Sequence, residues 1–169
     1  GERRLADGQL GEQLRRQQVQ VDLAKEAAKG MGLEIKEATI ANSGELGQAV
    51  DSLGKVDAYY VPTDNNVVSA VTTMVQAAEK NKALLVGSEA GQVEQGAAIT
   101  RGIDYTKLGE QTGAMALKIL KDGAKPAELP VGYADPANLQ LVLNPKAAEA
   151  YGVEIPAELT DEADRLVEG

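Results

Sequence analysis

Cysteine and histidine are both absent from this chain of 169 residues. Without cysteine there can be no disulfide, no thiolate nucleophile and no zinc–sulfur site. Without histidine the chain lacks the commonest general base and the commonest metal ligand of proteins. Catalytic centres of the Ser–His–Asp and Cys–His types are therefore excluded, and we expect neither a metal centre nor a cofactor.

Aromatic side chains are scarce as well, with five tyrosines and no phenylalanine or tryptophan. A surface that stacks nucleic-acid bases on aromatic rings is therefore not expected. The net charge of −9 points the same way, because an acidic surface repels phosphate backbones and anionic lipids. Hydrophobic residues make up 43% of the chain, which is enough for the core of one domain or one large lobe.

Long apolar runs are missing too, and no segment is long enough to cross a bilayer. The first ten residues, GERRLADGQL, lack the apolar centre of a signal peptide. We therefore expect that any export signal of the parent protein lies outside this sequence.

What the chain does contain is an alternation of strand-like and helix-like segments. Apolar or alternating runs predict five strands, at Leu33–Ile40, Val56–Pro62, Ala83–Ser88, Ala97–Asp104 and Asn138–Asn144. Helical patterns lie between and after them, at Asn42–Gly54, Asp64–Asn81, Tyr105–Gly123, Pro145–Gly152 and Ala157–Gly169. This alternation is typical of an α/β domain in which a parallel, flavodoxin-like sheet is covered by helices on both faces.

Several helix details follow from the same patterns. Ser43 is expected to cap the first of these helices and Gly54 to end it. Two helices carry an apolar face that we expect to be buried, formed by Val67, Val71, Met74, Val75 and Ala78 in one and by Leu108, Met115, Ile119 and Leu120 in the other. The Pro- and Gly-rich stretch Lys121–Asn138 is expected to be a long surface loop or hinge.

Polar residues follow three of the predicted strands at the point where each strand ends. They are Thr63-Asp64-Asn65, Ser88-Glu89 and Asp104-Tyr105. One interpretation is helix capping, in which side-chain oxygens accept hydrogen bonds from free backbone N–H groups. The other is a ligand site, because the carboxyl ends of parallel strands meet at one edge of a sheet. Neither a dinucleotide-binding nor a P-loop glycine motif is present at these ends.

A site at this edge would suit a small zwitterion. Helix N-termini offer N–H groups and partial positive charge to a carboxylate, whereas Asp64, Glu89 and Asp104 offer negative charge to an ammonium group. The ring of Tyr105 could cover an apolar side chain. Amino acids are the commonest small zwitterions, so we expect an amino acid-like ligand.

The segments "KVDAYYVPTDNNVVSAV", "ALLVGSEAGQVEQGAAITRGIDYTKLGEQTGAMALKIL" and "NLQLVLNPKAAEAYGVEIPAEL" carry a family resemblance. They resemble the substrate-binding proteins of a family of bacterial ABC importers, whose characterised members take up aromatic amino acids such as tryptophan. The resemblance implies one lobe, with C-terminal elements, of a periplasmic-binding-protein-like type I architecture. It also implies that Thr63, Asp64, Asn65, Ser88, Glu89, Asp104 and Tyr105 face the ligand. Many relatives have Asp where Glu89 stands, which leaves the ligand's identity open.

The resemblance also implies a partner and a place for the parent protein. Family members have two α/β lobes joined by a hinge, close around the ligand and dock on an ABC permease. They act outside the cytoplasm, in the periplasm or anchored at the cell surface as lipoproteins. The chain has about half the length that the family needs, so we expect the first lobe to be missing and the isolated chain to bind weakly or not at all.

The first residues depart from the family pattern. We expect Gly1–Gln18 to be an atypical helical segment, part of one amphipathic helix over Leu10–Met31, and residues 19–169 to form the lobe. One hypothesis is that Gly1–Gln18 is read in a shifted frame, since back-translation of "LGEQLRRQQ" allows codons for the family's loop. The lobe would then lack a central strand, and the exposed sheet edge could pair with a second copy.

Two other functions remain open at this stage. A flavodoxin-like enzyme could use Asp64 or Glu89 as acid or base, because carboxylates alone can run such chemistry. The sensor lobe of a transcription regulator could share the same architecture, although no basic helix-turn-helix segment is present. A substrate-binding protein needs no catalytic chemistry, which agrees best with a chain that lacks histidine and cysteine.

Overall fold

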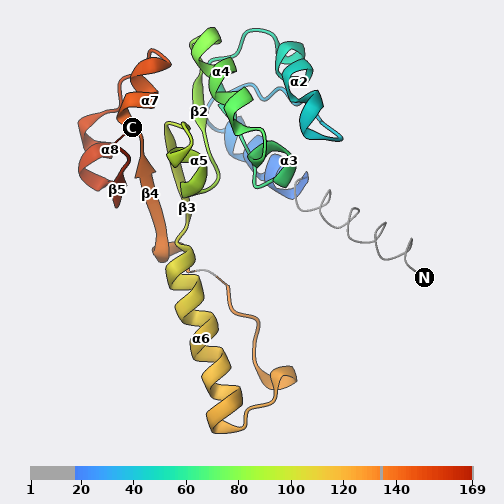
Figure 1. Cartoon of the computed structure of the whole chain (residues 1–169), viewed down its shortest axis with the longest axis vertical. Helices are drawn as coiled ribbons and strands as arrows, with labels where there is room; N and C mark the ends of the chain where they lie inside the picture. Colours follow the sequence, from blue (N-terminus) through green and yellow to red (C-terminus); the bar gives the residue numbers. More distant parts are fainter. Residues whose placement is uncertain (1–17, 134, 169) are drawn as a thin grey trace.

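The computed structural model describes residues 18–133 and 135–168, which form an α/β body with one projecting arm (Figure 1). Its strands are β1 (Ala58–Tyr60), β2 (Leu84–Val86), β3 (Ile99–Ile103), β4 (Leu139–Leu143) and β5 (Arg165–Leu166). Its α-helices are α2 (Leu46–Leu53), α3 (Asn65–Val68), α4 (Val71–Asn81), α5 (Ala90–Glu94), α6 (Tyr105–Asp122), α7 (Pro145–Ala150) and α8 (Ala157–Glu162). Short 3₁₀ turns lie at Ser43–Glu45, Pro126–Glu128 and Pro136–Asn138, and residues 18–29 form a further helix.

The sheet is mostly parallel, and its strand order follows the chain from β1 to β5. β1, β2 and β3 pair in parallel, as do β4 and β5. β3 and β4 pair in antiparallel fashion over their whole length, from Ile99 opposite Leu143 to Ile103 opposite Leu139. The α/β class is therefore confirmed, with one antiparallel pair where the sequence pattern predicts an all-parallel sheet.

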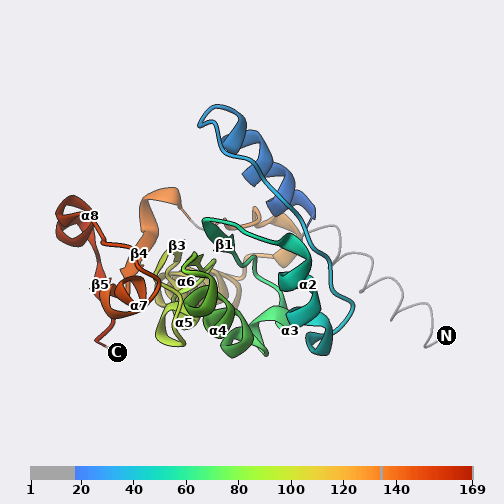
Figure 2. The same cartoon turned by 90° about the horizontal axis from the view of Figure 1, so that it is seen from above.

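The core lies where α4 and α5 pack on the central strands. α4 packs on β2 and on α2, while α5 packs on β3 and β4. Leu85, Val93 and Val142 are completely buried there, and Tyr151 at the end of α7 closes the core from the side of β4. Figure 2 shows α7 and α8 at the β4–β5 end of the sheet, opposite α2. Side-chain burial alternates along β3, and this alternation is the pattern by which the sequence predicts the strand.

The segment 33–40 is not a strand, although its sequence predicts one. Its residues belong to no ladder, and Leu33 and Ile35 keep 62% and 41% of their surface exposed. The segment is tethered at several points: the Leu33 N–H donates to the carbonyl of Ala28, and Lys25 forms an ion pair with Glu37. An alternating pattern makes a strand only when a neighbouring strand accepts its N–H groups, and no described neighbour does so here.

Helix α6 is predicted correctly in its extent but not in its surroundings. It runs over 18 residues from Tyr105 and is ended by Gly123 in the left-handed conformation. No residue of α6 is buried, however, and Figure 1 shows it leaving the body as a rod with the chain returning alongside. The returning segment covers part of one side, where Gly132 lies close to Gln111 and Met115. Of the face that we expect to be buried, Leu108, Met115 and Ile119 are only half-buried, and Leu120 is 81% exposed.

Smaller differences concern helix ends. The predicted helix Asp64–Asn81 is divided into α3 and α4 by a break at 69–70, and Val71, Met74 and Ala78 are the buried residues of α4. Asn42 caps the 3₁₀ turn Ser43–Glu45 that leads into α2, its side chain accepting from the Gly44 N–H, so the expectation of a Ser43 cap is wrong. Gly54 ends α2 as predicted, with a φ of 65°. Of the predicted helix Leu10–Met31, residues 18–29 are helical, and residues 1–17 lie outside the described part.

Candidate functional site

The three polar junctions lie at one edge of the sheet. β1, β2 and β3 are parallel, so Thr63, Ser88 and Asp104 all follow the carboxyl ends of neighbouring strands. In open α/β sheets this edge is where ligands bind. The topology therefore brings together what the sequence places at three separate points.

A hydroxyl pair joins the first two junctions. The Thr63 hydroxyl donates to the Ser88 hydroxyl over 3.0 Å. The backbone N–H of Thr63 in turn donates to the side-chain oxygen of Gln20 over 3.2 Å. Gln20 belongs to the helix of residues 18–29. Sequence patterns did not single out Gln20, because a glutamine on an amphipathic helix carries no local sign of a distant contact.

A phenol–carboxylate pair joins the second and third junctions. The Tyr105 hydroxyl donates to Glu89 over 3.4 Å, from the first residue of α6 to the cap of α5. Partial burial raises the pKa of Tyr105 above its usual 10.0, and the charge and hydrogen bond of Glu89 raise it further. The ring is 54% exposed, so it offers an apolar surface beside a carboxylate at the rim of the edge.

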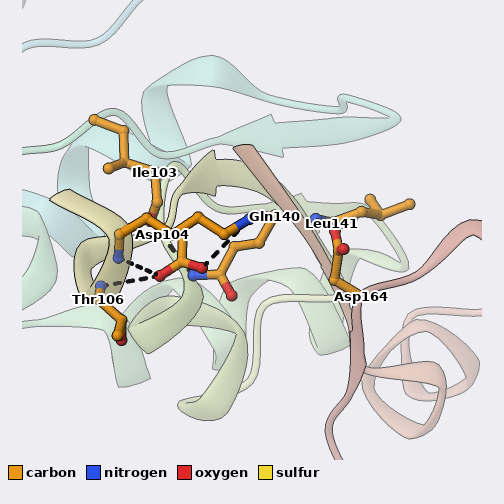
Figure 3. A network of polar contacts seen from close by, with 7 residues as sticks. Ile103, Asp104, Thr106, Gln140, Leu141 and Asp164 are labelled. Atoms are coloured by element: carbon orange, nitrogen blue, oxygen red, sulfur yellow. Dashed lines mark hydrogen bonds and ion pairs between the residues drawn. The ribbon is translucent and has the colours of Figure 1, made fainter. Parts of the chain in front are cut away.

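The other two acids act as helix caps. One carboxylate oxygen of Asp64 accepts from the N–H groups of Asn66 and Val67, at 2.6 and 3.1 Å. Asp104 does the same at the start of α6, accepting from Thr106 and Lys107 at 2.9 and 3.2 Å (Figure 3). The capping interpretation is therefore correct for Asp64 and Asp104, and the second carboxylate oxygen of Asp104 lies 4.0 Å from the ammonium nitrogen of Lys107.

The cap at Asp64 gives the first testable prediction. Replacing Asp64 by alanine should lower the free energy of unfolding by about 1 kcal/mol, because two N–H groups at the start of α3 lose their acceptor. Asp64→Asn keeps an oxygen at the same place and should retain most of that stability. Urea unfolding of both variants measures the difference. Equal stability of Asp64→Ala and the unmodified chain would show that the cap contributes nothing.

The remaining residues define what this rim offers. Asn65 is exposed, and its side chain makes no hydrogen bond with the residues that the structure describes. A cavity of about 300 Å³ opens nearby, between the first turns of α6 and the returning chain, but only Asp104 of the seven predicted site residues lines it. The rim thus combines hydroxyls, carboxylates, an amide and one exposed ring, which suits polar recognition of a small charged molecule.

Two further glutamines contribute to this edge and were missed. Gln92, on α5, accepts hydrogen bonds from Ser88, and Gln140, on β4, donates to the carbonyl of Ile103 over 3.4 Å (Figure 3). The helix α5 itself is absent from the sequence prediction because five residues carry too little periodicity to be recognised. Its buried glutamine therefore had no element to be placed on.

Within residues 18–133 and 135–168, no group of three or more acidic side chains is arranged to hold a metal ion. None of the helices in the same ranges has the length and apolar character needed to span a membrane.

Comparisons with known proteins identify relatives of this chain. The chain is 36% identical over 137 residues to a tyrosine-binding protein of Clostridioides difficile strain R20291, covering 80% of this chain and 39% of that protein. It resembles the solved ABC domain in complex with L-Trp from Streptococcus pneumonia, with a TM-score of 0.78 and 32% identity over 89% of this chain and 50% of the other. It also resembles the ligand-free, open structure of a substrate-binding protein with adhesive properties from Clostridium difficile, with a TM-score of 0.69 and 37% identity over 90% and 50% of the two chains.

The chain therefore spans half or less of the length of these relatives. The family model described as ABC transporter substrate binding protein matches residues 13–167, which is nearly the whole chain. On this match, and on the sheet edge described above, the chain belongs to the family of ABC transporter substrate-binding proteins.

Proposed function

We propose that this chain is one lobe of the solute-binding component of an ABC importer and that its ligand is a small molecule of the amino acid type. The observation that carries the proposal is the convergence of Thr63 with Ser88 and of Glu89 with Tyr105 at the carboxyl ends of β1, β2 and β3. This rim has acceptors for an ammonium group and an aromatic ring for an apolar side chain. Relatives named for binding tyrosine and L-Trp support an aromatic amino acid as the ligand.

The arm supports the view that a second lobe completes the site. Leu117 and Leu120 on α6 are 50% and 81% exposed, and Val131 and Tyr133 on the returning chain are 73% and 80% exposed. A helix with such a face is stable when another body packs on it. Half of each of the two solved relatives lies outside the part that matches this chain, which is enough for a second lobe packed against the arm.

The mechanism we propose is closure of two lobes around the ligand. A ligand that contacts both lobes favours the closed form, because only that form makes all of its contacts. The closed form would then dock on a membrane permease, and the parent protein would act outside the cytoplasm, as the family's role in transport suggests. No step of this mechanism breaks a covalent bond, so we propose that the protein is not an enzyme.

Half a cleft should bind poorly, and this can be measured. We expect titration of the chain with L-tryptophan, L-tyrosine and L-phenylalanine to show millimolar affinity at best, about a thousandfold weaker than a micromolar two-lobed site. Isothermal calorimetry and amide chemical-shift changes at residues 63–65, 88–89 and 104–105 would detect it. L-Lysine serves as a control that keeps the zwitterion but lacks the ring. Tight binding by the isolated chain would contradict the half-site, and shifts confined to other residues would contradict its location.

We also propose that two copies of the chain associate through exposed strand-like edges, with the segment 33–40 forming the contact between the copies. β1 pairs with β2 on one side only, and Tyr60 is 49% exposed at this edge. The unpaired segment 33–40 adds a second strand-like edge. If two such segments pair in antiparallel fashion about their centre, Lys36 of each copy lies opposite Glu37 of the other. Leu33 of each copy then lies opposite Ile40 of the other, so opposite charges and apolar side chains are matched. Exposed edges of this kind favour association with another chain.

A single proline tests the association. Ile35→Pro removes a backbone donor and prevents ladder formation, but residues 34–40 donate no described backbone hydrogen bond to the rest of the fold. Light scattering after size-exclusion chromatography should give the mass of a dimer for the unmodified chain and that of a monomer for Ile35→Pro. Ala38→Ser, which keeps the donor, should remain dimeric. A monomeric unmodified chain would refute the proposal.

A further inference from the structure

Gln92 is a buried polar residue directly beneath the rim. It lies on α5 with no exposed surface, and the core cluster beside it is built from apolar residues such as Val93, Ala97 and Ala98. A polar side chain is not placed in such a position without cost unless its hydrogen bonds are made. The contacts of its amide therefore show which part of the fold requires it.

The amide oxygen of Gln92 serves the turn that carries Ser88. It accepts from the Ser88 backbone N–H at 2.6 Å and from the Ser88 hydroxyl at 3.3 Å. The same hydroxyl accepts from Thr63 at 3.0 Å. One continuous chain of hydrogen bonds thus runs from the end of β1, through the end of β2, to the interior of α5. Because a backbone N–H can only donate, the atom facing Ser88 must be the amide oxygen.

Two further observations show that this arrangement is specific. A Cβ atom at Gly87 would lie 2.8 Å from the Gln92 oxygen, so the residue before Ser88 must be small for the amide to fit. The amide nitrogen of Gln92 and the hydroxyl of Thr100 are both buried, and neither finds a partner among the described residues. The side chain is therefore held by its amide oxygen alone, and its buried amide nitrogen, which has no acceptor among the described residues, costs free energy.

We infer that Gln92 is a positioning residue, whose buried amide oxygen holds the Ser88–Glu89 turn in its ligand-facing geometry and couples that turn, through Ser88, to Thr63. The inference rests on the proposed function for the meaning of "ligand-facing". It assigns a role in recognition to a residue that no ligand touches. A carboxylate rim that moved freely would contact a bound amino acid only part of the time, which weakens binding.

The test compares three variants of the full chain by NMR. Gln92→Met fills the same space without an acceptor, Gln92→Glu keeps an oxygen at the same position, and Gln95→Met changes an exposed glutamine of the same segment. In the unmodified chain the Ser88 amide should exchange slowly with solvent, although it lies in a bend. Gln92→Met should speed that exchange about tenfold, whereas Gln92→Glu should restore the protection and Gln95→Met should not change it.

The same samples are then titrated with L-tryptophan and L-tyrosine. We expect Gln92→Met to reduce the shift changes at Ser88 and Glu89 severalfold and Gln92→Glu to recover them, which a loss of stability alone would not produce. Unchanged ligand response in a variant whose Ser88 amide has lost protection overturns the inference and leaves the proposed function intact. Absence of any response in the unmodified chain counts against the proposed function instead, and the exchange rates still decide whether Gln92 holds the turn.

If Gln92→Met does not fold, the unmodified chain and Ser88→Ala still decide the matter. Ser88→Ala removes the hydroxyl link to Thr63 but leaves the backbone N–H on the amide oxygen. It should keep the Ser88 site protected while weakening the ligand response at residue 63. Fast exchange of the Ser88 amide in the unmodified chain would overturn the inference without any variant of Gln92.

Discussion

Replacing Gly102 by alanine should destabilise the chain by about 1–3 kcal/mol and displace the turn at Ser88 and Glu89. Gly102 is buried in β3, beyond the point where β2 ends. A Cβ atom there would lie 2.8 Å from the Ser88 carbonyl and 3.3 Å from the Glu89 Cα. Both neighbours are backbone atoms, which cannot rotate away, so the turn itself must move.

The displacement should reach the ligand edge, because the same turn carries Ser88 and Glu89 to Thr63 and Tyr105. Urea unfolding measures the stability, and amide shifts at residues 63, 88 and 105 report the movement. Gly113→Ala is the matched control, since nothing lies within 4 Å of a Cβ at that position on α6. It should stabilise the chain by about 0.5–1 kcal/mol through helix propensity. Equal shifts and stability for Gly102→Ala and the unmodified chain would refute the close approach.

Tyr151→Phe should lower the free energy of unfolding at neutral pH by about 1–3 kcal/mol. Tyr151 is 1% exposed, and its hydroxyl donates to the carbonyl of Gly96 through a short hydrogen bond. Phenylalanine fills the same space but leaves that carbonyl without this donor. The effect is therefore a hydrogen-bond loss rather than a packing loss.

The same residue predicts an alkaline limit to stability. Burial, and then the charge of Glu79, raise the pKa of Tyr151 from 10.0 to about 12. The unfolded chain releases the phenol proton at the lower value, whereas the folded chain keeps it until the higher one. The stabilisation is thus fully present below pH 10 and is lost as the pH rises to about 12, by on the order of 2 kcal/mol.

Urea unfolding at neutral pH and at the two ends of that window tests the prediction. The unmodified chain should lose stability across it, and Tyr151→Phe should lose less, so that the two curves converge. Tyr60 and Tyr105, whose pKa values are also raised by burial, remain in both proteins and account for the residual slope. Tyr133→Phe, at an 80% exposed position, should follow the unmodified chain. Parallel curves for Tyr151→Phe and the unmodified chain would show that Tyr151 does not titrate in this range.

Much of the sheet and of the candidate edge could be predicted from local patterns. β1, β2, β3 and β4 each coincide with a predicted apolar or alternating run between polar or glycine-containing turns, because strands that are buried on one or both faces restrict which residues can occupy them. The three polar junctions followed from the same runs, since each strand end fixes where the next polar residues lie. Capping and ligand recognition use the same residue types, however, and only the hydrogen bonds of the structure show that Asp64 and Asp104 cap helices.

The failures share one physical cause. Segment 33–40 has the pattern of a strand, and α6 has the pattern of a half-buried helix, but neither has the described neighbour that its pattern requires. An amphipathic pattern shows that one face of a segment is stable when buried, but it does not show which other part of the molecule packs on that face. The positions of Gln92 and Gln20 could not be predicted either, because a single glutamine has no periodicity and its partners lie on other elements.

The sequence by itself determined the α/β class, four of the five strands and the polar character of the strand ends, because these depend on the order of apolar and polar residues along the chain. Only the tertiary structure decided that β4 runs antiparallel to β3, that Thr63 contacts Ser88 and Glu89 contacts Tyr105, and that no residue of α6 is buried. Those features depend on which surfaces meet in space. Contacts between residues distant in the chain are fixed by packing and by strand register, and no local pattern encodes them.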